Sequence, residues 1–393
     1  MSTARLGVLL LATTLASPAF AQCGIGDFDQ NGMVDGADLG VLLGAWGAAA
    51  PGTPADLDDD GKVDGSDLGI MLGAWGEVNV QGGVFPNQWI SGAPQCAFEP
   101  QIQVHWYNPD LCIMRQSLCT NFEGPFITLL FGADKVLMMD TGAGNIQIAA
   151  KVTQLISEWL AARGQQSITL IVAHTHGHGD HVAGDSQFMG LPNTIVVGKS
   201  QAAVKAFFGI ANWPTQIVTY DLGGDRIVDI IPIPGHQNAH IAFYDRVSGI
   251  LFTGDTLYPG RLYISAFNDY LASIDRLVDF TADKPVCWVL GTHIEMTKTP
   301  GVDFPMGATS HPNEHALQLT RAHLLELQTA IHAMQGNPHY EVHDDFIVFP
   351  LGGVAGGDKG GGNANDGGVA ADPKCCARPS SLFDFRRLRE AAR

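Results

Sequence analysis

The sequence has few basic residues and no long apolar run. Only 22 Lys and Arg stand against 40 Asp and Glu among 393 residues, which gives a formal net charge of −18. More than half of this excess lies in residues 22–77, which hold 11 acidic residues and one Lys. Such an acidic segment repels the phosphate backbone of nucleic acids. No segment reaches the ~20 apolar residues of a transmembrane helix, so we expect neither a nucleic-acid partner nor a membrane span.

Two common sequence signatures are also missing. The chain has no Gly-x-Ser-x-Gly motif, the nucleophile turn of many serine hydrolases. Its seven cysteines do not have the spacing of a zinc knuckle. Cys96, Cys112 and Cys119 lie close enough in sequence to supply one disulfide, and the odd total leaves at least one thiol unpaired within the chain. A serine nucleophile is therefore not predicted, and the disulfide pairing stays open.

Residues 1–21 have the features of a secretory signal peptide. Arg5 precedes an apolar stretch over residues 7–15, and Ala19-Phe20-Ala21 fits a small-residue cleavage site. We expect cleavage near the last of these residues and a secreted or periplasmic, soluble product. A lipid anchor on Cys23 is disfavoured, because Gln22 stands where a lipoprotein signal has a small residue.

The acidic segment is an internal repeat in which residues 27–38 recur as residues 56–67. Both copies match a calcium-binding loop, which takes oxygen ligands from positions 1, 3, 5, 7, 9 and 12 around a Gly at position 6. The predicted ligands are Asp27, Asp29, Asn31, the Met33 carbonyl, Asp35 and Asp38 in the first copy, and Asp56, Asp58, Asp60, the Lys62 carbonyl, Asp64 and Asp67 in the second.

The repeat departs from an EF-hand in having Asp at position 12 and no helix before the loop. In both respects residues 22–77 resemble a dockerin module. The resemblance implies a small all-α module, two bound Ca²⁺ ions that its fold depends on, and a cohesin-like protein partner that docks on helices over residues 39–46 and 68–75. An acidic solvated linker is the plainer alternative. It is disfavoured because glycines, tryptophans and carboxylates all repeat in register.

Residues 78–350 alternate short β-rich runs with amphipathic helices, which favours a layered α/β domain with mixed sheets. Residues 127–131 and 135–140 predict paired strands, and apolar spacing predicts helices over residues 148–164 and 314–334. Further strand-like runs lie at residues 168–173, 194–197, 227–233, 241–244, 250–253 and 286–290. Residues 351–393 are Gly-rich at first and contain no core, so we expect a flexible tail.

A histidine-rich run, His174-Thr-His-Gly-His-Gly-Asp-His181, follows one of the predicted strands. Neutral imidazoles and a carboxylate suit Zn²⁺ or a similar ion. Gly177 and Gly179 let the loop coil tightly, since they remove Cβ clashes. A surface histidine tract that binds metal adventitiously is the alternative interpretation.

More candidate ligands follow other strands in an ordered series. Asp140 ends an early strand, His236 follows Pro-Gly, Asp255 lies in Phe-Thr-Gly-Asp-Thr, and His293 lies in Gly-Thr-His. Over residues 124–295 this series resembles the metallo-β-lactamase superfamily. The resemblance implies an αβ/βα sandwich over residues 78–350, with the site at one edge of the sheets.

The resemblance also implies a dinuclear zinc site. One metal would be held by His176, His178 and His236, the other by Asp180, His181 and His293. Asp255 would bridge them, and Asp140 would orient the loop. Two such cations ~3.5–4 Å apart lower the pKa of a shared water, so a bridging hydroxide is available at pH 7. Asp180 and Asp255 are therefore candidate catalytic residues.

The sequence restricts the substrate only in part. True β-lactamases of this superfamily lack the bridging Asp, so Asp255 argues against a β-lactam substrate and toward a thioester, lactone or phosphoester. Among small-molecule substrates an ester or lactone is preferred to a thioester, because an exported enzyme would rarely meet glutathione. The run Phe-Thr-Gly-Asp-Thr-Leu-Tyr is similar to that of glyoxalase-type thioesterases, but no glutathione-binding pattern is evident. Three alternatives remain: a phosphodiester hydrolase of the same fold, a di-iron redox protein, and a calcium-dependent extracellular assembly or binding protein with an inactive sandwich domain.

Three residues near the motifs have two interpretations each, and a fourth has one. His240 is a candidate catalytic residue that donates to a substrate oxygen, or a packed residue beside the site. Tyr258 and Tyr263 line the pocket or belong to the core. His174 is expected to be structural.

Overall fold

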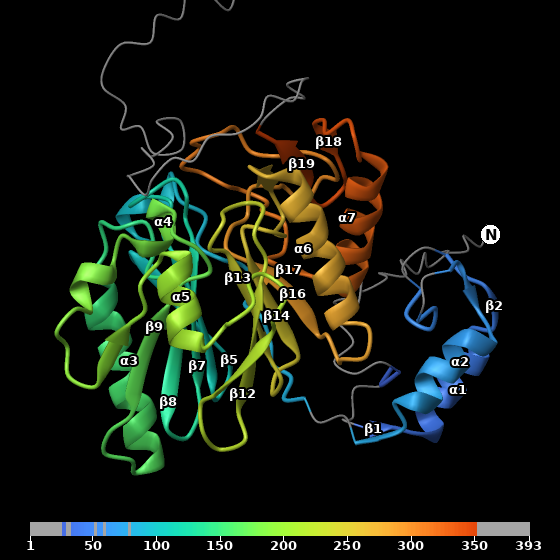
Figure 1. The fold of residues 1–393 in the computed structure, drawn as a ribbon, viewed down its shortest axis with the longest axis horizontal. Helices are drawn as coiled ribbons and strands as arrows, with labels where there is room; N and C mark the ends of the chain where they lie inside the picture. Colours follow the sequence, from blue (N-terminus) through green and yellow to red (C-terminus); the bar gives the residue numbers. More distant parts are fainter. Residues whose placement is uncertain (1–25, 29–32, 51–52, 58–59, 78–79, 352–393) are drawn as a thin grey trace, which may run out of the picture. The chain divides into compact units, whose positions relative to one another are not determined.

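The computed structural model describes residues 26–28, 33–50, 53–57, 60–77 and 80–351 (Figure 1). The predicted signal peptide, Cys23, the calcium ligands Asp29, Asn31 and Asp58, and the tail from residue 352 lie outside the described residues. Within the described ranges, no helix is long and apolar enough to cross a bilayer.

The repeat forms two similar loop–helix units. Helix α1 (Gly36–Gly44) and helix α2 (Gly65–Gly73) each begin at an Asp N-cap, Asp35 or Asp64, whose side chain accepts a hydrogen bond from the backbone. The third helical residue, Asp38 or Asp67, completes a capping box. Val34, Leu42, Val63 and Met71 form a small core with Ala55.

The expectation of an all-α module needs one correction. Strand β1 (Met33–Val34) pairs with β4 (Gly76–Glu77), and β2 (Gly47–Ala48) pairs with β3 (Lys62–Val63), both antiparallel. Each loop therefore pairs with the segment that follows the other copy's helix. The extended backbone buries the side chains of Val34 and Val63. It also lets the backbone N–H and C=O groups of the loops pair with the segments that follow the helices.

The larger part of the chain is built on two mixed six-stranded sheets. The first has the order β10-β9-β8-β7-β6-β5 and the second β11-β12-β13-β14-β16-β17. The first sheet consists of β5 (Ile102–Asn108), β6 (Leu111–Gln116), β7 (Phe126–Phe131), β8 (Lys135–Met139), β9 (Thr169–Ala173) and β10 (Thr194–Val196). The second consists of β11 (Val218–Asp221), β12 (Ile227–Pro232), β13 (Ile241–Asp245), β14 (Ile250–Gly254), β16 (Trp288–Gly291) and β17 (Gln318–Leu319). A third, small sheet has the order β15 (Arg261–Ile264), β19 (Ile347–Pro350), β18 (Glu341–Val342).

The two sheets pack face to face between helices (Figure 1). Ile113 and Leu137 of the first sheet share a buried cluster with Phe243 and Phe252 of the second. Helix α3 (Ile148–Arg163) covers the outer face of the first sheet, and α6 (Phe267–Phe280) and α7 (Arg321–Ala333) cover that of the second. Two shorter helices, α4 (Gly179–Val182) and α5 (Gln201–Phe208), complete the layers. Because each sheet buries both faces, its strands are nearly continuous apolar runs.

Most predicted elements are confirmed, including the β7–β8 hairpin and α3, which ends at Gly164 in the left-handed conformation. The helix predicted over residues 314–334 is wrong at its start, because α7 begins only at Arg321 after Thr320 as N-cap. Glu314 instead pairs with the buried guanidinium of Arg115 and lies directly after a turn, outside any helix. The hairpin of β5 and β6 was not predicted.

Strand direction places the candidate ligands at one edge of the sandwich. Strands β8 and β9 run parallel, as do β14 and β16, and two antiparallel pairings give β12 the direction of β14. Asp140, the histidine-rich run, His236, Asp255 and His293 follow the ends of β8, β9, β12, β14 and β16. The fold thus gathers residues that are more than 150 positions apart into one volume.

Candidate metal centre

One group of donor atoms consists of His176, His178, His236 and Asp255, whose ligand atoms all lie within 4.8 Å of one another. The distance from Asp255 Oδ2 is 3.7 Å to His176 Nε2 and 3.5 Å to His236 Nε2. His178 Nδ1 lies 2.9 Å from His176 Nε2 and 3.0 Å from His236 Nε2. His178 Nδ1 has either one hydrogen or one lone pair in the ring plane, so it makes at most one well-aligned hydrogen bond with these two nitrogens.

A second group consists of Asp180, His181, Asp255 and His293, again within 4.8 Å. Asp180 Oδ2 lies 3.3 Å from Nε2 of both His181 and His293. Asp255 reaches His181 Nε2 with Oδ2 at 3.3 Å and His293 Nε2 with Oδ1 at 3.4 Å. Ligands at about 2.0–2.1 Å around a tetrahedral zinc ion are separated by roughly 3.3–3.4 Å. The spacing of this group therefore fits one such ion, and Asp255 belongs to both groups.

The outer ring nitrogens orient three of the histidines. His181 Nδ1 lies 2.9 Å from Asp140 Oδ2, His236 Nδ1 lies 2.7 Å from the Tyr263 carbonyl, and His293 Nδ1 lies 2.9 Å from the Glu123 carbonyl. A carbonyl or carboxylate oxygen only accepts, so each Nδ1 carries the hydrogen. In the neutral ring, Nε2 then presents its lone pair to the centre, as a metal ligand requires.

Two buried polar atoms without a hydrogen-bond partner also indicate a metal site. His181 Nε2 and Asp255 Oδ1 are buried and have no hydrogen-bond partner. A buried polar atom without a partner costs on the order of 1–3 kcal/mol, and a cation between the two groups would satisfy both atoms. The donor set thus fits two divalent ions.

The charge balance of the centre favours cations. Burial, reinforced by the neighbouring His181 and His240, holds the pKa of His176 well below its usual value. Burial opposes ionisation of His293 too, but Asp255 and Asp180 overcome it and raise the pKa of His293 to about 10. Burial and the Asp180 charge raise the pKa of Glu123 to about 8. The carboxylates around His293 thus create a negative potential, which favours the binding of a proton or a metal cation there.

Asp140 connects the ligand loop to the end of β8. It is 1% exposed and adopts a left-handed backbone with a φ of 65°. Its carboxylate accepts hydrogen bonds from the Thr175 backbone N–H at 2.8 Å, the Thr175 hydroxyl at 2.9 Å and His181. These contacts agree with the orienting role predicted for Asp140.

The role of Gly177 is not the predicted one. An added Cβ there would meet the Lys199 carbonyl at 3.4 Å, an ordinary contact. A glycine that the site does need is Gly254, which has a φ of 53° and whose Cβ would lie 2.5 Å from His240 Nε2. This close approach allows the buried His240 ring to pack against the backbone next to Asp255.

The remaining candidates lie beside the centre. His240 is fully buried, and its ring centroid is 4.6 Å from that of His176, which favours the packed role over contact with substrate. The Tyr258 hydroxyl is buried and donates to the Arg261 carbonyl. Tyr263 acts on His236 through its backbone carbonyl. His174 Nε2 lies 2.8 Å from Asp185 Oδ1, a structural contact as expected.

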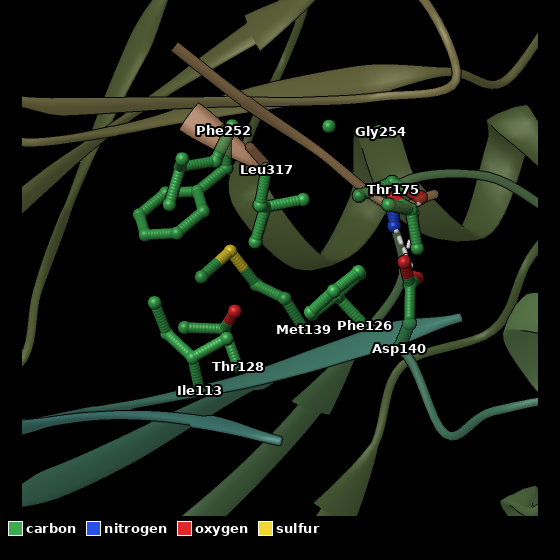
Figure 2. A pocket seen from close by; sticks show the side chains of 12 residues that line it. Ile113, Phe126, Thr128, Met139, Asp140, Thr175, Phe252, Gly254 and Leu317 are labelled. Carbon is green, nitrogen blue, oxygen red and sulfur yellow. Dashed lines mark hydrogen bonds between the residues drawn. The ribbon is translucent and has the colours of Figure 1, made fainter. Parts of the chain in front are cut away.

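A small cavity lies between the sheets next to the site (Figure 2). Asp140, Thr175 and Gly254 border it on one side, and Met139 and Phe252 are among its apolar lining. Its volume of about 20 Å³ accommodates one water and no substrate. A substrate must therefore approach the metal ligands from another side.

The described calcium-loop residues bind their own backbone. Asp56 accepts hydrogen bonds from the Asp60 and Gly61 N–H groups, and Asp67 accepts them from Leu57 and Asp64. In the described part of the repeat, no three carboxylates come close enough together to hold one ion. The predicted calcium sites also use residues outside the described ranges, so they stay a prediction.

Part of the chain is similar to known proteins. Residues 120–293 match the family model described as "Metallo-beta-lactamase superfamily". A hydroxyacylglutathione hydrolase of Pseudomonas fluorescens is 34% identical over 134 residues, which are 33% of this chain and 50% of that protein. A hydroxyacylglutathione hydrolase of Xanthomonas axonopodis pv. citri is 27% identical over 185 residues, 44% of this chain and 64% of that protein. Residues 120–293 are therefore similar to the metallo-β-lactamase superfamily.

The similarity is partial in extent. The chain spans about half the length of the first curated relatives it matches. Among solved structures, a metallo-beta-lactamase from Pontibacter korlensis has a TM-score of 0.38 and 16% identity, over 59% of this chain and 99% of that chain.

Proposed function

We propose that this protein is a dinuclear metal-dependent hydrolase. The observation that carries the proposal is the pair of donor groups that share Asp255. The full set of seven ligands predicted from the sequence is present, and an inactive sandwich domain would be expected to have lost part of it. The absence of a serine nucleophile motif agrees with a water nucleophile.

Two bound divalent cations would lower the pKa of a shared water toward neutrality and polarise the scissile carbonyl of the substrate. The protein residues set the charge of this site. Asp180 and Asp255 contribute two negative charges against four positive ones, so negative charge that develops on the substrate oxygen is stabilised. Asp180 makes its contacts to His181 and His293 with Oδ2, which leaves Oδ1 to accept a hydrogen from the attacking water.

The proposed substrate is an ester, a lactone or a thioester. The relatives named hydroxyacylglutathione hydrolase favour the thioester. The sequence itself has no glutathione-binding pattern, and an exported enzyme would rarely meet glutathione, which favours an ester or lactone. A phosphodiester is the second candidate, because the same two-cation arrangement also serves in-line displacement at phosphorus.

The test combines metal analysis with a substrate panel on the intact chain. Protein loaded with Zn²⁺, Mn²⁺ or Co²⁺ should retain close to two ions per chain after dialysis and should hydrolyse at least one of a model ester, lactone or thioester. Turnover of bis-p-nitrophenyl phosphate alone would support the second candidate. A folded protein that retains no metal and cleaves none of these compounds would refute the hydrolase proposal.

For residues 22–77 we propose an extracellular, calcium-binding, dockerin-like module. Support comes from the repeated capping geometry of α1 and α2 and from four carboxylates buried in the loops with a single Lys in the whole segment. These carboxylates are Asp27, Asp38, Asp56 and Asp67. Calcium would offset their mutual repulsion. An apolar residue just beyond the end of each helix is exposed, Trp46 after α1 and Trp75 after α2, which suits docking to a cohesin-like partner.

A further inference from the structure

The loop over residues 117–125, between β6 and β7, supports one metal ligand. Its Glu123 carbonyl accepts the hydrogen bond from His293 Nδ1 at 2.9 Å. Directly after the loop, the Phe126 N–H donates to the Thr292 carbonyl at 2.8 Å. The loop therefore fixes both the ring of His293 and the backbone beside it.

The inner side of this loop is attached to the segment that follows Asp140. Asn121 Nδ2 donates to the Ala143 carbonyl at 3.2 Å. Gln116, at the end of β6, accepts from the Ala143 N–H at 2.9 Å and donates to the Gly144 carbonyl at 2.8 Å. These hydrogen bonds link the loop to the backbone that follows Asp140.

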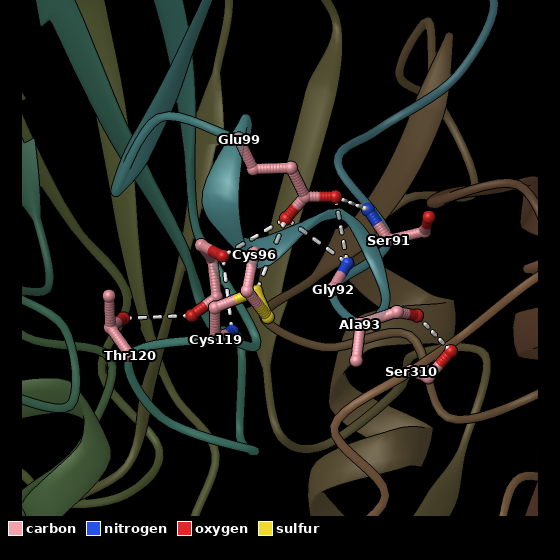
Figure 3. Close-up of a disulfide and its surroundings, with 9 residues drawn as sticks. Ser91, Gly92, Ala93, Cys96, Glu99, Cys119, Thr120 and Ser310 are labelled. Atoms are coloured by element: carbon pink, nitrogen blue, oxygen red, sulfur yellow. Dashed lines mark hydrogen bonds between the residues drawn. A yellow bond between two sulfur atoms is a disulfide. The ribbon is translucent and has the colours of Figure 1, made fainter.

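The outer side is held by a disulfide and one carboxylate (Figure 3). Cys119 is bonded to Cys96, 23 residues earlier. Glu99 accepts hydrogen bonds from the Ser91 and Gly92 N–H groups, each at 2.9 Å, and from the Ser117 hydroxyl at 3.1 Å. Residues 80–100 contain no regular element other than the short 3₁₀ turn Gln95–Ala97. The disulfide and the hydrogen bonds of Glu99 therefore provide much of the attachment between this segment and the loop over residues 117–125.

We propose that the Cys96–Cys119 disulfide and Glu99 position the loop so that its Glu123 carbonyl orients His293, and that metal retention at Asp180, His181 and His293 depends on them. The inference rests on the two-metal function proposed above. Loss of an outer hydrogen-bond partner of a ligand typically weakens metal binding ~10–100-fold.

The effect should be asymmetric between the two metals. The outer nitrogen of His236 bonds to Tyr263, and that of His176 faces the Thr175 hydroxyl at 3.2 Å. Neither partner belongs to the loop 117–125 or to the segment 80–100. Loosening the loop should therefore release one ion and leave the group of His176, His178 and His236 occupied.

The experiment compares the intact chain with two variants made without reductant, since thiol reagents themselves bind metals. One is the double variant Cys96→Ser/Cys119→Ser, and the other is Glu99→Gln, which keeps the shape but has one acceptor oxygen for three donors. Glu158→Gln, an exposed position on α3, is the matched control. Each protein is loaded with Zn²⁺, dialysed against graded chelator and analysed for bound zinc, with thermal unfolding as the check on folding.

We expect near two ions per chain in the unmodified protein and the control, and near one in both loop variants at chelator concentrations where the unmodified protein is still full. Adding His293→Ala to the double variant should cause little further loss, because both changes act on the same ion. Folded loop variants that retain zinc as well as the unmodified protein would overturn the inference. If the double variant does not fold, Glu99→Gln decides. An unmodified protein that holds no zinc would refute the proposed function itself.

Discussion

Asp140 Oδ2 lies 2.9 Å from His181 Nδ1, while the same carboxylate accepts two hydrogen bonds from Thr175 at the other end of the ligand loop. One buried charge thus fixes the tautomer of His181 and the start of the loop together.

Replacing Asp140 by Asn should lower metal affinity and turnover by ~10–100-fold without unfolding the protein. Asn tolerates the left-handed backbone of this position. Its amide, however, has one acceptor oxygen in place of two, so it cannot accept from both the Thr175 N–H and His181 Nδ1, and either the loop or the His181 ring loses its hydrogen-bond acceptor. Zinc retention against a chelator measures the effect, and Asp279→Asn, at an exposed position on α6, is the control. Unchanged zinc retention would show that Asp140 does not orient the ligand.

Replacing Asp255 by Asn should lower metal content and turnover together, by more than the ~10–100-fold expected for an outer partner. Oδ2 of the carboxylate lies near residues of both donor groups and Oδ1 lies near His293, and the amide removes both the charge and one acceptor. Elemental analysis and turnover of the best substrate are measured on the same preparation. A variant that keeps two ions and full turnover would mean that Asp255 does not bridge.

The contact between His315 and Asp345 predicts a pH dependence of stability. Asp345 accepts hydrogen bonds from His315 Nε2 at 2.7 Å and His323 Nε2 at 3.1 Å, and these lower the pKa of Asp345. Burial opposes protonation of His315, but Asp345 and the Ala316 carbonyl raise its pKa above the usual value.

The sign follows from linkage. The Asp345 contribution is present above its unfolded pKa of about 3.9 and is lost as the pH falls through the folded value. The His315 contribution is full below an unfolded pKa of about 6.5 and is lost as the pH rises through the higher folded value. In urea unfolding at pH 6 and pH 9, His315→Gln should reduce the loss of stability on going to pH 9. His332→Gln, at an exposed histidine with an ion pair to Asp275, should retain the full loss, and equal losses in both variants would rule out the His315 assignment.

Deleting residues 22–77 should leave turnover within a few-fold of the intact enzyme. Every proposed transition-metal ligand lies between His176 and His293, and every proposed calcium ligand lies between Asp27 and Asp67. Calcium should increase the helical circular dichroism of the intact chain but not of the deletion variant, because the acidic loops need counter-charge to fold. A folded deletion variant without activity would contradict the separation of the two parts.

The strand ends were predictable from the apolar runs that stop at His or Asp. The assignment of these residues as metal ligands came from the resemblance to the metallo-β-lactamase superfamily and stays a prediction. The outer partners of His236 and His293 were not predictable. They are the backbone carbonyls of Tyr263 and Glu123, and any residue type offers a carbonyl. The start of α7 was missed for a related reason. The ion pair between Glu314 and Arg115 joins residues 199 positions apart, which a local apolar period cannot detect.

The pairing of the cysteines also needed the fold. Three cysteines were close enough in sequence for one disulfide, but Cys112 points into the buried core of the first sheet, where burial raises its thiol pKa to about 12. Cys96 and Cys119 lie on irregular segments that meet near the loop over residues 117–125. The burial of His240 was likewise invisible in its spacing from His236.

The shared carboxylate of Asp255 has a consequence for how the protein acquires its ions. In the proposed two-metal centre, the first ion would fix the rotamer of Asp255 and so prepare an oxygen for the second, but it would also use part of the charge common to both groups. The two uptake steps would thus be thermodynamically linked, and a binding isotherm would report on the pair. With less than two equivalents of metal, the protein would be a mixture of chains that hold no ion, one ion or two ions. A chain that holds a different metal in each donor group would also be possible.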